Sequence, residues 1–181
     1  MHGADPNGRD REGSPILIAA AIRGQPSTVN VLLDAGADVT FRDEGGMTAL
    51  LWAAAYPGHS QTLAALLDHG ASVTERDDQG TTALMWAAFS ARDTNALDLL
   101  LNRGAEINAQ SVSGETALMY AAISGHPESV RLLLERGADP ATRDNTGQSA
   151  LDLAIKNSQH GVVELLRRAE TNTGRLQKNG Q

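Results

Sequence analysis

A seven-residue phrase recurs in this chain at a fixed interval, and this periodicity constrains the fold more than any other feature. The phrase is TALLWAA at 48–54, TALMWAA at 82–88 and TALMYAA at 116–122, so successive copies begin 34 residues apart. Two further markers keep the same phase. They are Asp-x-x-Gly beginning at 10, 43, 77 and 144, replaced by SVSG at 111–114, and Gly-Ala beginning at 3, 36, 70, 104 and 137. A period of this size indicates stacked copies of one short supersecondary unit.

Each unit has the signals of two short helices followed by a turn. The hydroxyl of Thr48, or of its counterparts Thr82, Thr116 and Ser149, is suited to cap the start of a first helix. Leu50, Ala53 and Ala54 then have the i, i+3, i+4 spacing of one helical face, and the small alanines allow a second helix to approach closely. The second helix ends in a Leu-Leu pair followed by a glycine, where a left-handed C-cap requires one.

Together these motifs (D-x-x-G-x-T-A-L, A-A, G-H and L-L-x-x-G-A-D) resemble the ankyrin repeat family over residues 10–168. The resemblance implies an all-α repeat solenoid in which helix-turn-helix units stack and hairpin-like loops join them. We divide the chain into the end of a preceding repeat (1–9), repeats at 10–42, 43–76, 77–110 and 111–143, a C-terminal capping repeat at 144–169, and a flexible tail at 170–181. The half-repeat at 1–9 also suggests a fragment of a longer protein.

The chain departs from the family pattern at two places in each unit. Alanine replaces the proline that follows the capping threonine in repeats two to five. The family's histidine becomes Asp152 in the last repeat, and an apolar residue that we expect to pack between repeats in the others: Ile18, Leu51, Met85 and Met119. In repeat three Arg92-Asp93 replaces the Gly-His pair, so we expect a different loop between its two helices.

Composition and charge argue against several classes of function. The chain has 181 residues, is 41% hydrophobic and carries a net charge of −7, so we expect a folded domain that binds no nucleic acid. It has no cysteine, no signal peptide and no apolar run of membrane-spanning length, and we predict a cytoplasmic protein with no membrane contact. The five histidines and the turn aspartates recur with the repeat, and no catalytic motif is present. We therefore predict no enzyme activity, no metal and no cofactor.

Arginine precedes the turn aspartate in four of the five units, at Arg9, Arg42, Arg76 and Arg143, while Gln110 interrupts the series. Such a row of guanidinium groups is suited to clamp carboxylates or phosphates. The alternative, which we favour, is that each arginine pairs with a turn aspartate of a neighbouring repeat.

Aromatic residues are only 3% of the chain, yet five of the six fall on one face of the first helices. Trp52 lies about 200° around the helix from Leu50, so it faces away from the second helix. The same face holds Tyr56, Trp86, Phe89 and Tyr120, and by resemblance to the family it is the concave face, where partners dock. Two hypotheses remain open: the rings bind a partner, as interface aromatics often do, or they fill space between neighbouring helices.

We predict a non-enzymatic module that binds a protein or peptide segment in this concave groove. The alternatives are a structural spacer within a longer chain, a module that carries or regulates a separate enzyme domain, and an aromatic cage for methylated lysine formed by Trp52 and Trp86. The candidate partner-binding residues are Trp52, Tyr56, Trp86, Phe89, Tyr120, Met47, Arg42, Arg76, Glu44 and Asp78.

Overall fold

The computed structural model describes residues 5–11, 13–90 and 94–178. This part of the chain contains ten helices and no β-strand. The helices are α1 (Ile16–Ile22), α2 (Pro26–Asp34), α3 (Ala49–Ala55), α4 (Ser60–Asp68), α5 (Ala83–Ser90), α6 (Asn95–Asn102), α7 (Ala117–Ser124), α8 (Pro127–Glu135), α9 (Ala150–Lys156) and α10 (His160–Lys178). The predicted all-α repeat solenoid is confirmed.

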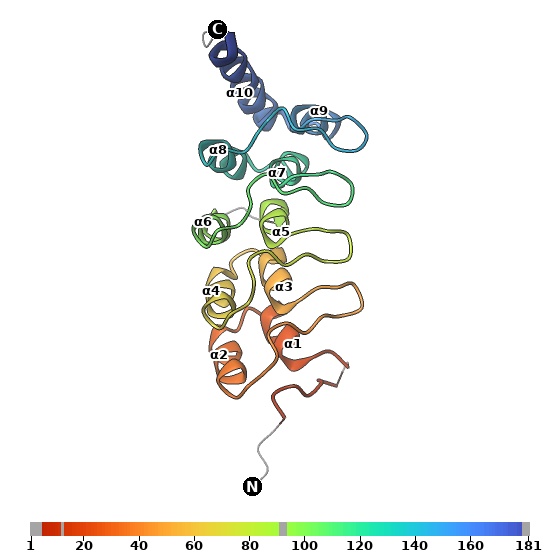
Figure 1. Cartoon of the computed structure of the whole chain (residues 1–181), viewed down its shortest axis with the longest axis vertical. Helices are drawn as coiled ribbons and strands as arrows, with labels where there is room; N and C mark the ends of the chain where they lie inside the picture. Colours follow the sequence, from red (N-terminus) through yellow and green to blue (C-terminus); the bar gives the residue numbers. More distant parts are fainter. Residues whose placement is uncertain (1–4, 12, 91–93, 179–181) are drawn as a thin grey trace.

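The helices form two rows along the long axis of the molecule (Figure 1). The first helix of each repeat (α1, α3, α5, α7, α9) lies in one row and the second (α2, α4, α6, α8, α10) in the other, and hairpin-like loops project from the side of the first helices. Each first helix packs on its neighbours in the row and on its own second helix. The fold is therefore a one-dimensional stack, in which each repeat depends on those beside it.

The predicted caps start four of the five first helices. Thr48 Oγ1 accepts from Leu51 N at 3.4 Å, and Thr82 and Thr116 accept from Met85 N and Met119 N in the same way. Ser149 forms a complete capping box with Asp152. In the first repeat, Pro15 precedes α1 and makes no side-chain cap. Its fixed φ suits a helix start.

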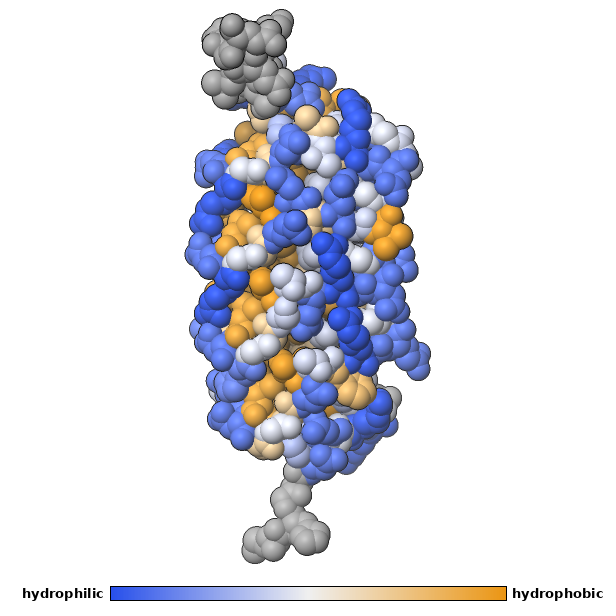
Figure 2. Space-filling model, in the orientation of Figure 1, coloured by the Kyte–Doolittle hydropathy of each residue, from blue (hydrophilic) through white to orange (hydrophobic). Residues whose placement is uncertain are grey.

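The core lies between the two rows. Leu50, Ala53 and Ala54 are at most 2% exposed, which confirms the predicted face. Leu51 and Met85 are also fully buried, so apolar residues do replace the family's histidine as inter-repeat packing. Figure 2 shows an interrupted apolar stripe between the rows, with mostly hydrophilic residues and one isolated hydrophobic spot on the hairpin side. The stripe follows the seam between the rows, so it is the edge of the core.

Glycine ends the second helices as predicted. Gly70 and Gly104 have φ of +90° and +89°. The N–H of Gly70 donates to Leu67 O and that of Ala71 to Leu66 O, at 3.2 and 3.0 Å, which satisfies carbonyls at the end of α4. This geometry turns the chain out of the helix and toward the hairpin.

Backbone hydrogen bonds join successive hairpins. The N–H of Asp78 donates to Gly45 O at 3.2 Å, that of Val112 to Gln79 O at 2.9 Å, and that of Asn145 to Ser113 O at 2.9 Å. The hairpins pack so closely that a Cβ added at Gly46 would lie 2.3 Å from Asp78 Oδ1. The hairpins of repeats two to five therefore form a continuous ribbon beside the first helices.

At the C-terminal end, helix α10 continues to Lys178, beyond residue 170, where we placed the start of the tail. Leu166 is fully buried and fixes the start of the helix, and no proline follows to stop its propagation. The predicted change of loop at Arg92-Asp93 lies outside the described residues, as does the beginning of the half-repeat at 1–9.

Candidate protein-binding surface

The arginine row binds backbone rather than carboxylates of neighbouring turns. Arg42 Nη1 donates to Gly46 O in its own hairpin at 2.7 Å and to Arg76 O in the next hairpin at 2.6 Å. Arg76 Nη1 donates to Gly80 O at 3.0 Å and to Gln110 O at 2.8 Å. The prediction that these arginines pair with turn aspartates is wrong. The turn aspartates already accept from backbone N–H groups of their own turns and from the tryptophan indoles.

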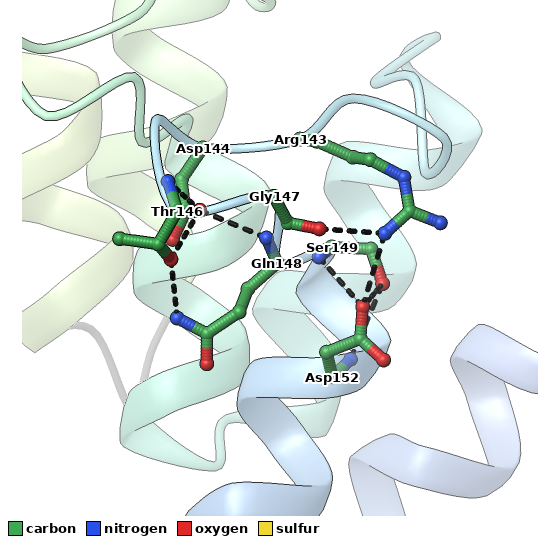
Figure 3. Close-up of polar contacts among 7 residues, drawn as sticks. All are labelled: Arg143, Asp144, Thr146, Gly147, Gln148, Ser149 and Asp152. Carbon is green, nitrogen blue, oxygen red and sulfur yellow. Dashed lines mark hydrogen bonds and ion pairs between the residues drawn. The ribbon is translucent and has the colours of Figure 1, made fainter.

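Gln110 continues this row instead of interrupting it. Its Nε2 donates to Gly114 O at 2.8 Å and to Arg143 O at 3.3 Å, the same two kinds of acceptor that Arg42 uses. Arg143 donates to Gly147 O at 2.7 Å and lies 3.4 Å from Asp152 Oδ2 (Figure 3). The guanidinium groups thus have a structural use, as links along the hairpin ribbon.

The turn aspartates hold both the hairpin and the aromatic rings. Asp43 Oδ1 accepts from the N–H groups of Gly45 and Met47, each at 2.9 Å, which fixes the turn. Its other oxygen, Oδ2, accepts from Trp52 Nε1 at 2.7 Å. In the next repeat Asp77 Oδ2 accepts from Trp86 Nε1 at 3.0 Å. Each carboxylate therefore joins a hairpin to the first helix of its own repeat.

Repeat four replaces both partners of this contact. Ser111 stands in place of the aspartate, and Tyr120 in place of the tryptophan. The Tyr120 hydroxyl lies near the side chains of Thr81 of the preceding repeat and Glu115. Burial raises the pKa of this hydroxyl, while the interaction with Thr81 lowers it. We call Trp52, Trp86 and Tyr120 the inner rings. The polar end of each inner ring is thus turned toward a hairpin.

The rings form two groups. Trp52 stacks on Tyr56 with centroids 6.2 Å apart, and Tyr56 stacks on His59 at 5.6 Å. Phe89 of repeat three meets the ring of Tyr120 of repeat four edge-on at 6.2 Å. Among the described rings, none of these contacts joins Trp52 to Trp86, so the geometry gives the two-tryptophan cage no support.

Exposure separates the predicted site residues into two kinds. Trp52, Trp86 and Tyr120 are half-buried and pack against the core, which supports the packing hypothesis for these three rings. Tyr56 and Phe89 are 40% and 44% exposed, although both are large and apolar. Tyr56 and Phe89, the outer pair of rings, are therefore the aromatic side chains that this face exposes to solvent.

The hairpin residues that we predicted to contact a partner also divide. Met47 is 7% exposed and lies in the core, so it has no surface for a partner, and that prediction is corrected. The residue enters the core because it directly precedes the buried cap Thr48. Glu44 and Asp78 are exposed in the hairpins and remain candidates for a polar rim.

The sixth ring, Phe41, lies in a separate cavity. The Arg9 guanidinium lies 5.3 Å from its centroid, and Arg9 Nη1 donates to Gly13 O at 2.6 Å. These residues, together with Arg42 and Glu44, line a cavity of about 580 Å³ between the first two hairpins. Its lining carries charges of both signs and does not select one ligand.

The structure adds contacts that the sequence analysis missed. A row of polar pairs joins successive second helices: His69 Nε2 lies 3.2 Å from Asp34 Oδ1, Arg103 Nη1 lies 2.9 Å from Asp68 Oδ1, and Arg136 contacts Asp98. The sequence analysis also missed the hydrogen bonds between tryptophan and aspartate, although the sequence contains a signal for them. Aspartate and tryptophan are nine residues apart in repeats two and three, and both are replaced in repeat four.

Two other kinds of site find no support in the part of the chain that the structure describes. No group of three or more His, Cys, Asp or Glu side chains there is placed to hold a metal ion. No described helix is long and apolar enough to cross a membrane.

The fold defines a helical repeat module built from stacked pairs of helices. The family described as ankyrin repeats (three copies) matches residues 1–77, 17–111 and 84–175. The chain belongs to the ankyrin repeat family. Ankyrin repeats generally mediate protein–protein interactions and are typically not enzymes.

One curated relative shows how much of a longer protein such a match covers. An ankyrin repeat protein of Acanthamoeba polyphaga mimivirus is 41% identical over 54 residues, which is 30% of this chain. The match spans 13% of the viral protein.

Proposed function

We propose that the rings of repeats two to four bind a segment of another protein, and that Tyr56 and Phe89 are the main contacts. The exposure of these two side chains carries the proposal. Both are large aromatic residues with about two fifths of their surface in water, in a chain whose core is built from leucine and alanine. Aromatic residues at interfaces commonly contribute a large share of the binding free energy.

Neighbouring side chains hold the rings of Tyr56 and Phe89 in place, which favours binding of a partner without rearrangement. Tyr56 is stacked between Trp52 and His59, and Phe89 lies against Tyr120. Trp52 is in turn held by Asp43. A partner that covers Tyr56 or Phe89 therefore meets rings that are already ordered, which lowers the entropic cost of association.

A peptide selection tests the proposal. The whole chain is used to select binders from a random 12-residue phage library, and the affinity of the recovered peptides is measured for the double variant Tyr56→Ser/Phe89→Ser. We expect an affinity loss of about tenfold or more, since ~1.4 kcal/mol is one decade, with little change in Tm because both side chains are exposed.

Val31→Ser is the matched control. Val31 is 67% exposed, but it lies on α2 in the other row of helices. Its substitution should leave the affinity unchanged. Peptides that bind the double variant as well as the parent chain, or that lose equal affinity with Val31→Ser, would contradict a docking role for the rings.

A further inference from the structure

We infer that the segment bound by this surface is basic, and that arginine is its preferred anchor. The inference rests on the proposed function and adds the chemistry of the partner. It follows from the way in which the hairpins separate negative from positive side chains in repeats two to four.

Carboxylates lie beside the rings in three consecutive repeats. Asp43 accepts a hydrogen bond from Trp52 and Asp77 accepts one from Trp86, while Glu115 lies near the Tyr120 hydroxyl. All three acidic residues are only partly buried. Asp43 accepts three hydrogen bonds from the protein, whereas a carboxylate has about four acceptor positions. Each repeat therefore presents a fixed negative charge that keeps some capacity for a donor.

Each exposed ring is linked to one of these carboxylates through an inner ring. Tyr56 stacks on Trp52, which donates to Asp43. Phe89 contacts Tyr120, whose hydroxyl lies near Glu115. The surface thus contains two tracks, each with an apolar ring at the exposed end and an anion at the hairpin end.

Positive charge is placed elsewhere. The guanidinium groups of Arg42 and Arg76 donate to backbone carbonyls of the hairpins, and Arg143 does the same at the end of repeat four. The other arginines of repeats two to four that the structure describes belong to the row of second helices: Arg103, Arg131 and Arg136. Arg92 lies outside the described residues. Within the described part, no cation neutralises the carboxylates beside the rings.

An arginine side chain matches both ends of a track. Its planar guanidinium stacks on aromatic faces and donates a fork of hydrogen bonds to a carboxylate, whereas a lysine ammonium is a compact point charge. The net charge of −7 also draws a basic segment toward the molecule and repels an acidic one. An arginine-containing segment is thus complementary to the surface in both shape and charge.

The test uses the peptides recovered by the selection described above. They should be enriched in arginine relative to the unselected library, with lysine enriched less and aspartate and glutamate depleted. Their affinity should fall when NaCl is raised from about 0.1 M to about 1 M, since the Debye length shortens from ~10 Å to ~3 Å. Glu115→Gln should weaken binding about threefold or more, while the Tyr120 ring stays in place.

Glu135→Gln is the matched control. It removes the same charge from an exposed position at the end of α8, in the row of second helices, and should change the affinity by less than about twofold. Peptides that need Tyr56 and Phe89 but carry no excess of basic residues would overturn this inference and leave the proposed function standing. Equal losses with Glu115→Gln and Glu135→Gln would also overturn it. Peptides that bind independently of the rings would instead remove the proposed function.

Discussion

The three middle repeats and the two end repeats use the same scaffold but differ at one position of the first helix. That position holds Trp52, Trp86 and Tyr120 in the middle repeats. In repeats one and five it holds Ala19 and Leu153, which are 6% and 5% exposed. Helices α1 and α9 form and pack without a ring or a ring-bound carboxylate. The rings are therefore an addition to the repeat and not a condition for its fold.

The largest expected difference between the middle and the end repeats is the stability lost when a buried leucine of the core is replaced. Leu100 in α6 and Leu166 in α10 are both fully buried. Leu100→Ala should lower the free energy of unfolding by about 2–5 kcal/mol. Leu166→Ala should cost less, since a repeat with one neighbour can relax around the cavity. Thermal and urea unfolding measure both values, and an equal or larger cost for Leu166→Ala would show that the end is as rigid as the middle.

The next effect concerns the glycine that ends a middle helix. Gly104→Val should destabilise the chain by about 1–3 kcal/mol, because a β-branched residue is strained at φ +89°. Apart from the two neighbouring residues, no heavy atom lies within 4 Å of an added Cβ, so the Cβ itself meets open space. Gly104→Asn tests this assignment by urea unfolding, since asparagine tolerates the left-handed region. If asparagine and valine cost the same, backbone strain is not the cause.

A smaller effect is expected from the ring contacts that only the middle repeats have. Trp86→Phe keeps a ring but leaves Asp77 Oδ2 without its indole donor. We expect a loss of about 1 kcal/mol in unfolding free energy, the usual value of such a hydrogen bond. Urea unfolding should show it, and Trp86→Phe should not disturb peptide binding through Tyr56 and Phe89. An unchanged midpoint would mean that the indole contributes only by packing.

The smallest effect should appear at the junction of repeats one and two. This junction uses His69 with Asp34, whereas the next uses Arg103 with Asp68. The hydrogen bond with the Ala65 carbonyl, followed by that with Asp34, raises the pKa of His69 above its ordinary value. Protonated His69 therefore stabilises the fold below pH ~6.5, and this contribution is lost as pH rises through the higher folded pKa.

Melting curves between pH 5.5 and 8.5 test the pH effect. The parent chain should lose slightly more Tm toward pH 8.5 than His69→Arg, whose charge persists over that range. Equal slopes for the two proteins would show that the pair with Asp34 adds nothing to stability.

Most of the fold was predictable because its signals are local. A threonine cap, an Ala-Ala pair and a glycine after Leu-Leu each act within a few residues, and Thr48, Ala53 and Gly70 behave as expected. The helical tail to Lys178 was not predicted, since polar residues favour no state strongly until Leu166 anchors the helix. Local sequence signals thus predict the repeat units better than they predict the ends of the chain.

The candidate surface was predictable only in part. Helical periodicity placed the rings on one face, but it could not tell Trp86, half-buried, from Phe89, which is 44% exposed. That difference depends on how far neighbouring helices approach, which is a tertiary property. Met47 and the arginines were misjudged for a related reason. The face that a hairpin side chain occupies depends on the twist of the turn, which residue type does not determine.

The arginine row has a consequence for how such a protein can change in length. Arg42 bonds to the backbone of Arg76, and Arg76 bonds in the same way to the backbone of Gln110. Because the acceptor is a main-chain carbonyl, the link does not depend on which side chain the following unit carries. A repeat that is duplicated, deleted or exchanged by recombination still presents this acceptor to its neighbour. As far as this link is concerned, the array can thus gain or lose whole units, and with them ring–carboxylate pairs, without a compensating mutation.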